Sequence, residues 1–288
     1  DSERAVNVSG SRFTYIKGDL ARIQFAIIQM TLETLTNEDT LKVIAEEAGL
    51  DVSTKPFIPV LAPTFVKPAV YNRMARLEPK EDKYYIEADD VYLAGSAEHT
   101  VGPMHMDEVI PAEELPLRYI AYSTCFRREA GSYGKDTKGI LRQHQFDKME
   151  METFAKPEDA LREQEFLVAI QEYMLRKLNL PHQVVHVCTG DMGLPDYRQI
   201  DVETWMPGQN TYRETHSADF MTSYQSRRLN TRYKNAEGKL EYVHMNDATL
   251  FAMGRIIIAI VENYQQADGS VLVPDVLKKY MGTTEIIK

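Results

Sequence analysis

Cysteine is scarce in this chain: Cys125 and Cys188 are the only two among 288 residues. Two thiols cannot build a framework of several disulfide bonds or a zinc site with four thiolate ligands. A chain with so few cysteines is typical of a reducing compartment, so we expect a cytoplasmic setting.

Long apolar runs are also missing. The most hydrophobic stretch, residues 256–261, is far shorter than the roughly 20 residues that a membrane-spanning helix needs. The N-terminus, Asp-Ser-Glu-Arg, lacks the basic and then apolar pattern of a secretory signal. The sequence therefore predicts no membrane partner.

Positive charge is in deficit, because 33 Lys and Arg residues stand against 43 Asp and Glu residues, a formal net charge of −10. A protein that holds nucleic acid over its whole surface is normally basic. Any nucleic-acid contact of this chain must therefore be local. The one basic concentration, within residues 227–234, is interpreted most simply as a solvated strand face.

Glycine-rich phosphate-binding signatures are absent too. No predicted strand is followed by a Gly-rich turn and a helix, so the sequence has neither a dinucleotide-binding fingerprint nor a P-loop. If the protein uses ATP, it holds the nucleotide in another way. Apolar residues make up 43% of the chain and charged residues 26%, as in ordinary globular proteins.

The hydrophobic spacing predicts an α+β fold with a largely antiparallel sheet, because many strands lie in the middle of the chain with helices before, between and after them. The expected helices cover residues 20–35, 157–178 and 249–264, the last of them buried. The expected strands cover residues 56–63, 83–87, 91–94, 118–126, 145–154, 184–188, 201–206 and 227–234.

Charged side chains alternate along the strand expected over residues 145–154. Phe146, Lys148, Glu150 and Glu152 fall on one face, because successive residues of a strand point to opposite sides. Unpaired charges are costly to bury. This face is either the floor of a polar pocket or an exposed face with cross-strand ion pairs, and the pattern leaves both open.

The run from Phe126 to Glu150, FRREAGSYGKDTKGILRQHQFDKME, resembles motif 2 of class II seryl-tRNA synthetases along its whole length. The class in general shares an arginine, a loop and an aromatic residue here. The stretch from Glu129 through Asp136 and Thr137 to Gln145 is similar to the seryl branch specifically. The resemblance implies the class II aminoacyl-tRNA synthetase catalytic fold, α+β with a largely antiparallel sheet flanked by helices.

This resemblance assigns roles within motif 2. Arg127 would bind both the α-phosphate of ATP and the serine carboxylate, since its planar fork matches anionic oxygens. Glu129 would accept a hydrogen bond from the adenine amino group, and Phe146 would stack on the adenine ring. Glu150 would bind serine, and the loop would face the acceptor end of the tRNA. If the strand over residues 118–126 persists, Arg127 and Glu129 share one face.

Two further blocks resemble the family. Residues 94–98, Ala-Gly-Ser-Ala-Glu, are similar to the element that lines the serine pocket; taken alone, this segment would be interpreted as a turn. Residues 212–217 resemble the segment that binds ATP and its metal, whereas residues 218–224 depart from the family pattern. The implied residues are Ser96, Ala97 and Glu98 for serine; Glu214, Thr215, His216 and Ser217 for ATP; and Glu214 and Ser217 for Mg²⁺, which prefers oxygen ligands.

Residues 252–255, Ala-Met-Gly-Arg, resemble motif 3, which implies that Arg255 lies against the γ-phosphate and acts in catalysis with Arg127. A structural ion pair is the alternative for Arg255. Thr249 holds the hydroxyl position of the serine pocket. Upstream of it, Asp247 and Ala248 stand where the family has Asn and Gly, or Asn246 takes the asparagine position if the register slips by one.

The resemblance implies one catalytic domain over residues 1–288 that activates L-serine with ATP and Mg²⁺, and in the full enzyme charges tRNA. Residues 1–12 would be the remnant of a linker to an N-terminal helical arm that grips the tRNA. Pro63 fits the motif 1 proline, which implies a homodimer. Two other functions stay open: an amino acid ligase that loads a carrier protein, and a non-catalytic paralogue.

Overall fold

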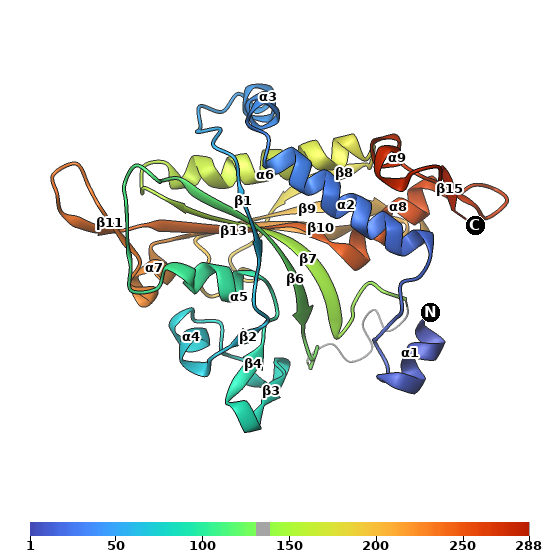
Figure 1. Ribbon diagram of the computed structural model, residues 1–288, viewed down its shortest axis with the longest axis horizontal. Helices are drawn as coiled ribbons and strands as arrows, with labels where there is room; N and C mark the ends of the chain where they lie inside the picture. The colour runs from blue at the N-terminus through green and yellow to red at the C-terminus, as the bar shows by residue number, and fades with distance from the viewer. Residues whose placement is uncertain (131–138, 288) are drawn as a thin grey trace.

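The computed structural model describes residues 1–130 and 139–287, and a seven-stranded sheet forms its centre (Figure 1). β1 runs parallel to its neighbour β6, and all other neighbouring strands of this sheet are antiparallel. The α+β, largely antiparallel architecture is thereby confirmed. In spatial order the strands are β1 (Ile58–Leu61), β6 (Leu117–Phe126), β7 (Gln145–Ala155), β13 (His244–Ala252), β10 (Thr211–Thr222), β9 (Arg198–Met206) and β8 (His182–His186).

Helices cover one face of this sheet (Figure 1). Apolar side chains such as Met149 and Met151 of β7 point into the core between the sheet and these helices, because they alternate with the polar side chains of the strand. The covering helices are α2 (Asp19–Leu35), α3 (Glu38–Ala48), α6 (Ala160–Lys177), α8 (Met253–Tyr264) and α9 (Asp275–Met281).

Smaller elements surround the opposite face. They are the helices α1 (Ser2–Val8), α4 (Pro68–Arg73), α5 (Glu98–Val101) and α7 (Tyr224–Leu229), and the strands β2 (Phe65–Val66), β3 (Tyr85–Ile86), β4 (Val91–Leu93), β5 (Val109–Ile110), β11 (Arg232–Lys234) and β12 (Leu240–Tyr242). The short strands β14 (Val271–Leu272) and β15 (Ile286–Ile287) pair with each other and pack against the core on the helix-covered side. None of the helices in the described ranges is long and apolar enough to cross a membrane.

Helix α6 fixes the two strands at the centre of the sheet. Gln171 Nε2 donates to the backbone oxygens of Ser217 in β10 and Thr249 in β13, at 2.7 and 2.8 Å. Both strands shift register near these residues, so their carbonyl groups need partners outside the ladder. The glutamine supplies that partner and thereby holds Ser217 and Thr249 on neighbouring strands.

Two predicted elements differ from the structure, and a third segment contains a helix that was not predicted. The helix expected from residue 249 begins at Met253, because residues 249–252 complete β13; an apolar run buried on both sides has no period that separates strand from helix. The strand expected over residues 227–234 is the end of α7 followed by β11, with Asn230 between them at φ 61°. The expected linker over residues 1–12 contains helix α1.

Candidate active site

Polar side chains form rows across the sheet face that the large helices leave uncovered. In one row, Glu152 of β7, Asp247 of β13 and Asp219 of β10 are register partners. In the next row, Glu150 of β7 pairs with Thr249 of β13, and its carboxylate accepts a hydrogen bond from the Thr249 hydroxyl at 3.3 Å. The alternation predicted for this strand is confirmed.

A cavity of about 280 Å³ lies over these rows. The polar face is therefore the floor of a pocket rather than an exposed, ion-paired surface. The lining includes ten of the residues singled out in the sequence: Glu98, Arg127, Glu129, Phe146, Glu150, Glu214, Thr215, Ser217, Thr249 and Arg255.

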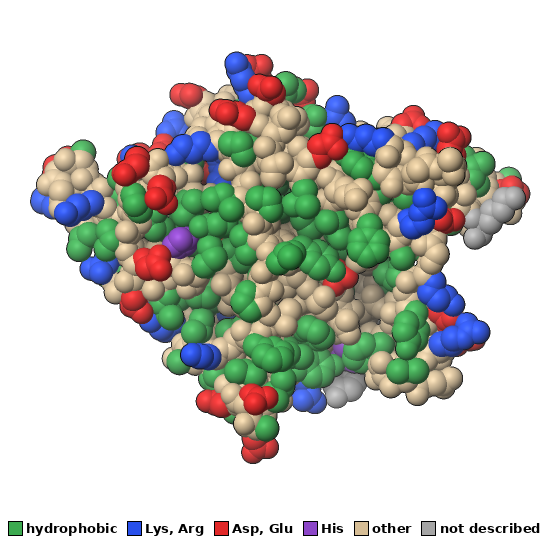
Figure 2. All heavy atoms as spheres, in the orientation of Figure 1, with side chains coloured by type: hydrophobic (Ala, Val, Ile, Leu, Met, Phe, Trp, Pro, Cys, Tyr) green, Lys and Arg blue, Asp and Glu red, His purple; other side chains and the backbone are tan. Residues whose placement is uncertain are grey.

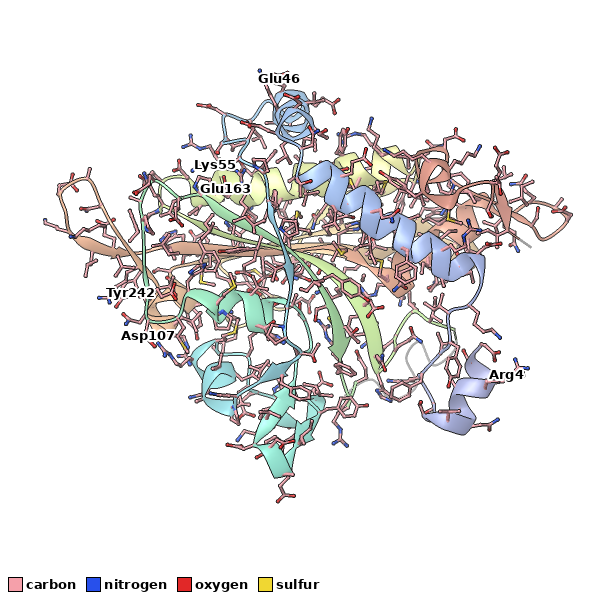
Figure 3. The ribbon with its side chains drawn as sticks, viewed as in Figure 1. Arg4, Glu46, Lys55, Asp107, Glu163 and Tyr242 are labelled. Carbon is pink, nitrogen blue, oxygen red and sulfur yellow. The ribbon has the colours of Figure 1, made fainter. Side chains whose placement is uncertain are left out.

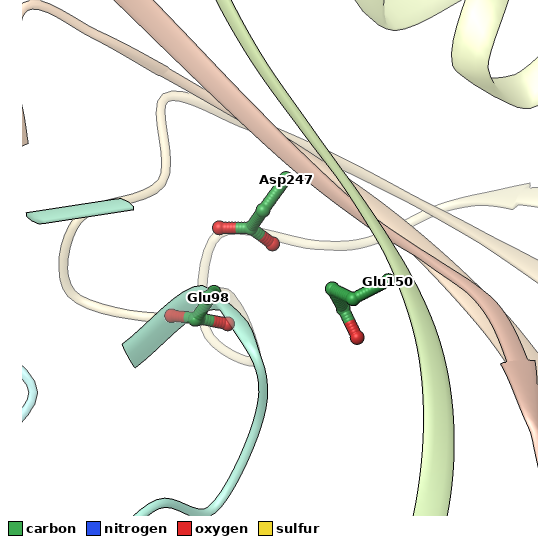
Figure 4. Close-up of side chains that lie close together, drawn as sticks. All are labelled: Glu98, Glu150 and Asp247. Atoms are coloured by element: carbon green, nitrogen blue, oxygen red, sulfur yellow. The ribbon is translucent and has the colours of Figure 1, made fainter. Parts of the chain in front are cut away.

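Three buried carboxylates meet in this cavity. Oxygen atoms of Glu98 in α5, Glu150 in β7 and Asp247 in β13 lie within 4.8 Å of one another (Figure 4). Two cationic side chains accompany them, since Arg76 Nε lies 2.7 Å from Glu98 Oε1 and Lys148 Nζ lies 2.5 Å from Glu150 Oε2. Such pairing offsets part of the cost of burying charge. We call Glu98, Glu150 and Asp247 the acidic cluster.

The members of the acidic cluster differ in their electrostatics. Burial alone would raise the pKa of Glu98, but the positive groups around it, Arg76 first among them, together outweigh burial and the pKa falls to about 2. Burial raises the pKa of Asp247 well above its ordinary value, and the neighbouring carboxylates of Glu98 and Asp219 raise it further. Burial also raises the pKa of Glu150. Glu98 thus forms a close ion pair with Arg76 at 2.7 Å, whereas Asp247 lies 3.8 Å from the same guanidinium.

Two arginines also line the cavity. The Arg127 guanidinium lies over the Phe146 ring, 5.4 Å from its centroid, and Arg127 Nε donates to the Gly95 carbonyl at 3.0 Å. Arg255 Nη1 donates to the Glu214 carbonyl at 2.8 Å and lies 3.2 Å from Glu214 Oε1. The ion pair considered as the alternative for Arg255 is therefore present, and its partner is itself one of the predicted ligand residues.

Three predicted site residues do not line the cavity. Ser96 is buried beside it and accepts a hydrogen bond from Lys148 Nζ at 3.0 Å. Ala97 belongs to an apolar cluster on the same side of the sheet. His216 is fully buried against Phe251, and burial lowers its pKa to about 3. A neutral, enclosed ring cannot reach a ligand in the cavity, so we leave His216 out of the ligand set.

The structure shows which residue takes the asparagine position of motif 3. Asn246 points to the helix-covered face, where its Nδ2 donates to Thr153 Oγ1 at 3.0 Å and to the Ala160 carbonyl at 3.1 Å. Asp247, the next residue, lines the cavity, and Ala248 is in the core. An aspartate therefore occupies the position where the family has asparagine.

Sequence reasoning missed several residues of the cavity wall. Arg76 follows α4, Asp196 lies between β8 and β9, and Asp219 belongs to the stretch that departs from the family pattern. Lys148 was placed on the correct face but received no role. Lys148 lies two residues before Glu150 on the same strand face, and this spacing could have indicated a role in the site. No such sequence pattern pointed to Arg76 or Asp196.

The loop of motif 2 falls partly outside the described residues, including Gly131, Gly134, Asp136 and Thr137. β6 ends at Phe126, so Arg127 and Glu129 do not continue the strand as expected, and Glu129 has φ 55°. Both still reach the cavity.

The residues predicted to hold Mg²⁺ offer a compatible set of donors. Glu214 supplies a carboxylate and Ser217 a hydroxyl, both on β10 and both at the cavity. Asp201 of β9 is the register partner of Ser217, and burial followed by the Glu214 carboxylate raises its pKa to about 7. A divalent cation is the ligand that such hard oxygens fit.

Comparison with known proteins agrees with this geometry. Residues 82–264 match the family model described as tRNA synthetase class II core domain (G, H, P, S and T). The chain is 43% identical to a serine--tRNA ligase of Geobacillus sp. (strain WCH70), over 100% of this chain and 65% of that protein. It is also 43% identical to the one of Sulfurihydrogenibium sp. (strain YO3AOP1), over 98% and 64%. The chain thus spans about 65% of the length of these relatives.

Solved structures show the same likeness. A seryl-tRNA synthetase from Pyrococcus horikoshii complexed with ATP superposes with a TM-score of 0.87 at 39% identity, covering 100% of this chain and 61% of that one. A prolyl-tRNA synthetase from Giardia lamblia gives a TM-score of 0.76 at 14% identity over 94% of this chain and 51% of that one, which shows the fold alone.

Proposed function

Because the chain belongs to the class II tRNA synthetase core family, we propose that it activates L-serine with ATP to give seryl-adenylate and pyrophosphate. The observation that carries the proposal is a single cavity that combines the acidic cluster and the Thr249 hydroxyl with Arg127, Phe146 and Arg255. The first set suits an amino acid with a hydroxyl group, and the second suits a nucleotide. Its relatives among the serine--tRNA ligases support this choice of substrate.

In this proposal the acidic side of the cavity binds serine. Glu150 and the Thr249 hydroxyl already share a hydrogen bond, and both can bind the serine hydroxyl. A buried site built for a hydroxyl discriminates against amino acids that lack it, since its own polar groups would then be left unpaired. Alanine and glycine should therefore be poor substrates.

The arginine side of the cavity binds ATP. Phe146 stacks on the adenine ring, Glu129 accepts from its amino group, and Arg127 neutralises the α-phosphate beside the serine carboxylate. Arg255 lies against the γ-phosphate and exchanges its contact with Glu214 for the nucleotide. Mg²⁺, held by Glu214 and Ser217, supplies charge neutralisation at the phosphates when bound. The serine carboxylate attacks the α-phosphorus, and positioning replaces a protein nucleophile.

Further partners are proposed for the whole protein. Motif 2 faces the acceptor end of tRNA(Ser), and two copies of the chain associate near Pro63, which is exposed between β1 and β2. A reducing, cytoplasmic setting is part of the proposal, and the two cysteines, Cys125 and Cys188, which form no disulfide bond, are compatible with it.

Serine-dependent ATP–pyrophosphate exchange tests the proposal, with threonine, alanine and glycine as parallel substrates. We expect exchange with serine, and we expect the exchange rates with alanine and glycine to be lower than with serine by roughly 10²-fold or more. Binding of ATP without any amino acid-dependent exchange would favour the non-catalytic paralogue. Exchange together with loading of a carrier protein but not of tRNA would favour the carrier-protein ligase.

A further inference from the structure

Asp247 is the member of the acidic cluster without a close cation. Glu98 has Arg76 at 2.7 Å and Glu150 has Lys148 at 2.5 Å, whereas the nearest guanidinium atom of Arg76 lies 3.8 Å from Asp247 Oδ2. The Asp247 side chain is 2% exposed, and within the described part of the chain its Oδ2 has no hydrogen-bond partner. A buried carboxylate oxygen without a hydrogen-bond partner destabilises the folded protein unless a bound ligand supplies that partner.

We propose that Asp247, together with Glu98, binds the α-ammonium group of the amino acid substrate. This assignment rests on the proposed activation of serine. It makes Asp247 a specificity-determining residue, because the site then accepts an amino acid and rejects the corresponding hydroxy acid. Asp247 stands where the family has a neutral asparagine, and its carboxylate can form a charge-assisted hydrogen bond with an ammonium group.

The spacing of the acidic cluster fits an ammonium ion. Acceptors at about 2.8 Å from a tetrahedral ammonium nitrogen lie about 4.6 Å apart. The oxygens of Glu98, Glu150 and Asp247 lie within 4.8 Å of one another, and the three side chains converge from α5, β7 and β13 (Figure 4). One ammonium group can therefore donate to both Asp247 and Glu98, with the Glu150 carboxylate next to it.

The surrounding charges also favour a monocation. Asp247 stands between Glu152 and Asp219 in the row across β7, β13 and β10, so three buried carboxyl groups adjoin one another. A positive ligand relieves this repulsion. A divalent metal ion fits less well, because Arg76 and Lys148 already contact the cluster and would lie against it.

The test compares serine with the glycerate enantiomer of the same configuration, in which a hydroxyl replaces the ammonium group. The Michaelis constant for serine and the inhibition constant for glycerate are measured by pyrophosphate exchange for the wild type and Asp247→Asn. We expect the serine constant to rise about 10- to 100-fold, the effect of losing a hydrogen bond between charged groups. The glycerate constant should stay unchanged or fall. Asp247→Ala provides a second variant with the same expectation.

Asp196→Asn is the matched control, since Asp196 is another buried carboxylate that faces Arg76, at 3.5 Å, but is not part of the acidic cluster. We expect it to change both constants by the same factor. Equal weakening of serine and glycerate by Asp247→Asn, with normal exchange by the wild type, would overturn the assignment of Asp247 alone. Absence of serine-dependent exchange in the wild type would overturn the proposed function and this assignment with it.

Discussion

Arg255 stands at the start of α8, where its contacts with Glu214 hold it at the edge of the cavity. If it binds the γ-phosphate, Arg255→Ala removes a charge-assisted partner of the nucleotide. We expect kcat/KM for ATP in pyrophosphate exchange to fall roughly 10²-fold or more, with a smaller change in the Michaelis constant for serine.

Arg198→Ala is the control for this prediction. Arg198 is the first residue of β9, the strand next to β10, and it forms a partly exposed ion pair with Glu165 at 3.3 Å. Such a pair contributes little to stability, so its loss should leave exchange kinetics nearly unchanged. Similar kinetics for the two variants would contradict the role of Arg255.

At the scale of elements, a buried arginine joins β6 to α6. Arg118 donates to both carboxylate oxygens of Glu163, at 2.8 and 2.7 Å, and to the backbone oxygens of Lys55 and Ser53 before β1. Figure 3 shows Glu163 of α6 beside Lys55. Because Arg118→Ala leaves a buried carboxylate without its partner, we expect the free energy of unfolding to fall by about 3–5 kcal/mol.

Urea denaturation of Arg118→Ala and Arg162→Ala measures this effect. Arg162 lies next to Glu163 on the same helix but pairs with Asp159 at the surface, so its loss should cost less than about 1 kcal/mol. If the two variants unfold at the same urea concentration, the buried pair does not hold β6 and α6 together.

His182 connects β8 to α6 in a way that depends on pH. A hydrogen bond with Glu172 raises the pKa of His182, and His182 in turn lowers the pKa of Glu172. A raised histidine pKa stabilises the folded state below the unfolded value of about 6.5, and this contribution is lost as the pH rises through the folded pKa. His182→Gln should therefore destabilise the protein more at pH 6 than at pH 8.

Thermal unfolding at the two pH values tests this prediction, with His186→Gln as the control on the same strand. His186 is exposed, and its replacement should have a similar, small effect at both values. A larger loss of stability at pH 8 than at pH 6 for His182→Gln would show that the Glu172 contact does not act through the imidazolium.

At the scale of the whole molecule, apolar side chains gather on the face that carries β1 and β2 (Figure 2). Ile58, Leu61 and Phe65 are 47%, 85% and 56% exposed, and β1 is the edge strand of the large sheet. Exposed apolar groups beside an open strand edge are typical of a subunit interface. We expect a homodimer, and we expect Leu61→Glu to yield monomers because it would bury a charge.

Sedimentation of the wild type, Leu61→Glu and Leu194→Glu measures the assembly. Leu194 is 76% exposed but lies between β8 and β9, away from β1 in the sheet order, so its variant should remain dimeric. A monomeric wild type at micromolar concentration would contradict the prediction.

Much of the candidate site could be predicted from the sequence because its chemistry is local. Phe146, Lys148 and Glu150 share a face by strand alternation alone, whatever the strand pairs with. The resemblance to motifs 2 and 3 then identified Arg127 and Arg255. Arg127 directly follows the end of β6, and Arg255 lies in the first turn of α8, so each belongs to a short segment with a defined local structure. Most of these residues reach one cavity.

The sequence by itself determined the α+β class and which side chains of each strand lie together, because alternation is a property of the backbone. Only the tertiary structure decided that Asp247 rather than Asn246 faces the cavity, since a shift of one residue reverses the face and polar residues stand at both positions. It also decided that Arg76 and Asp219 meet Asp247. Those contacts join segments far apart in the chain, and strand order, which no local period encodes, brings them together.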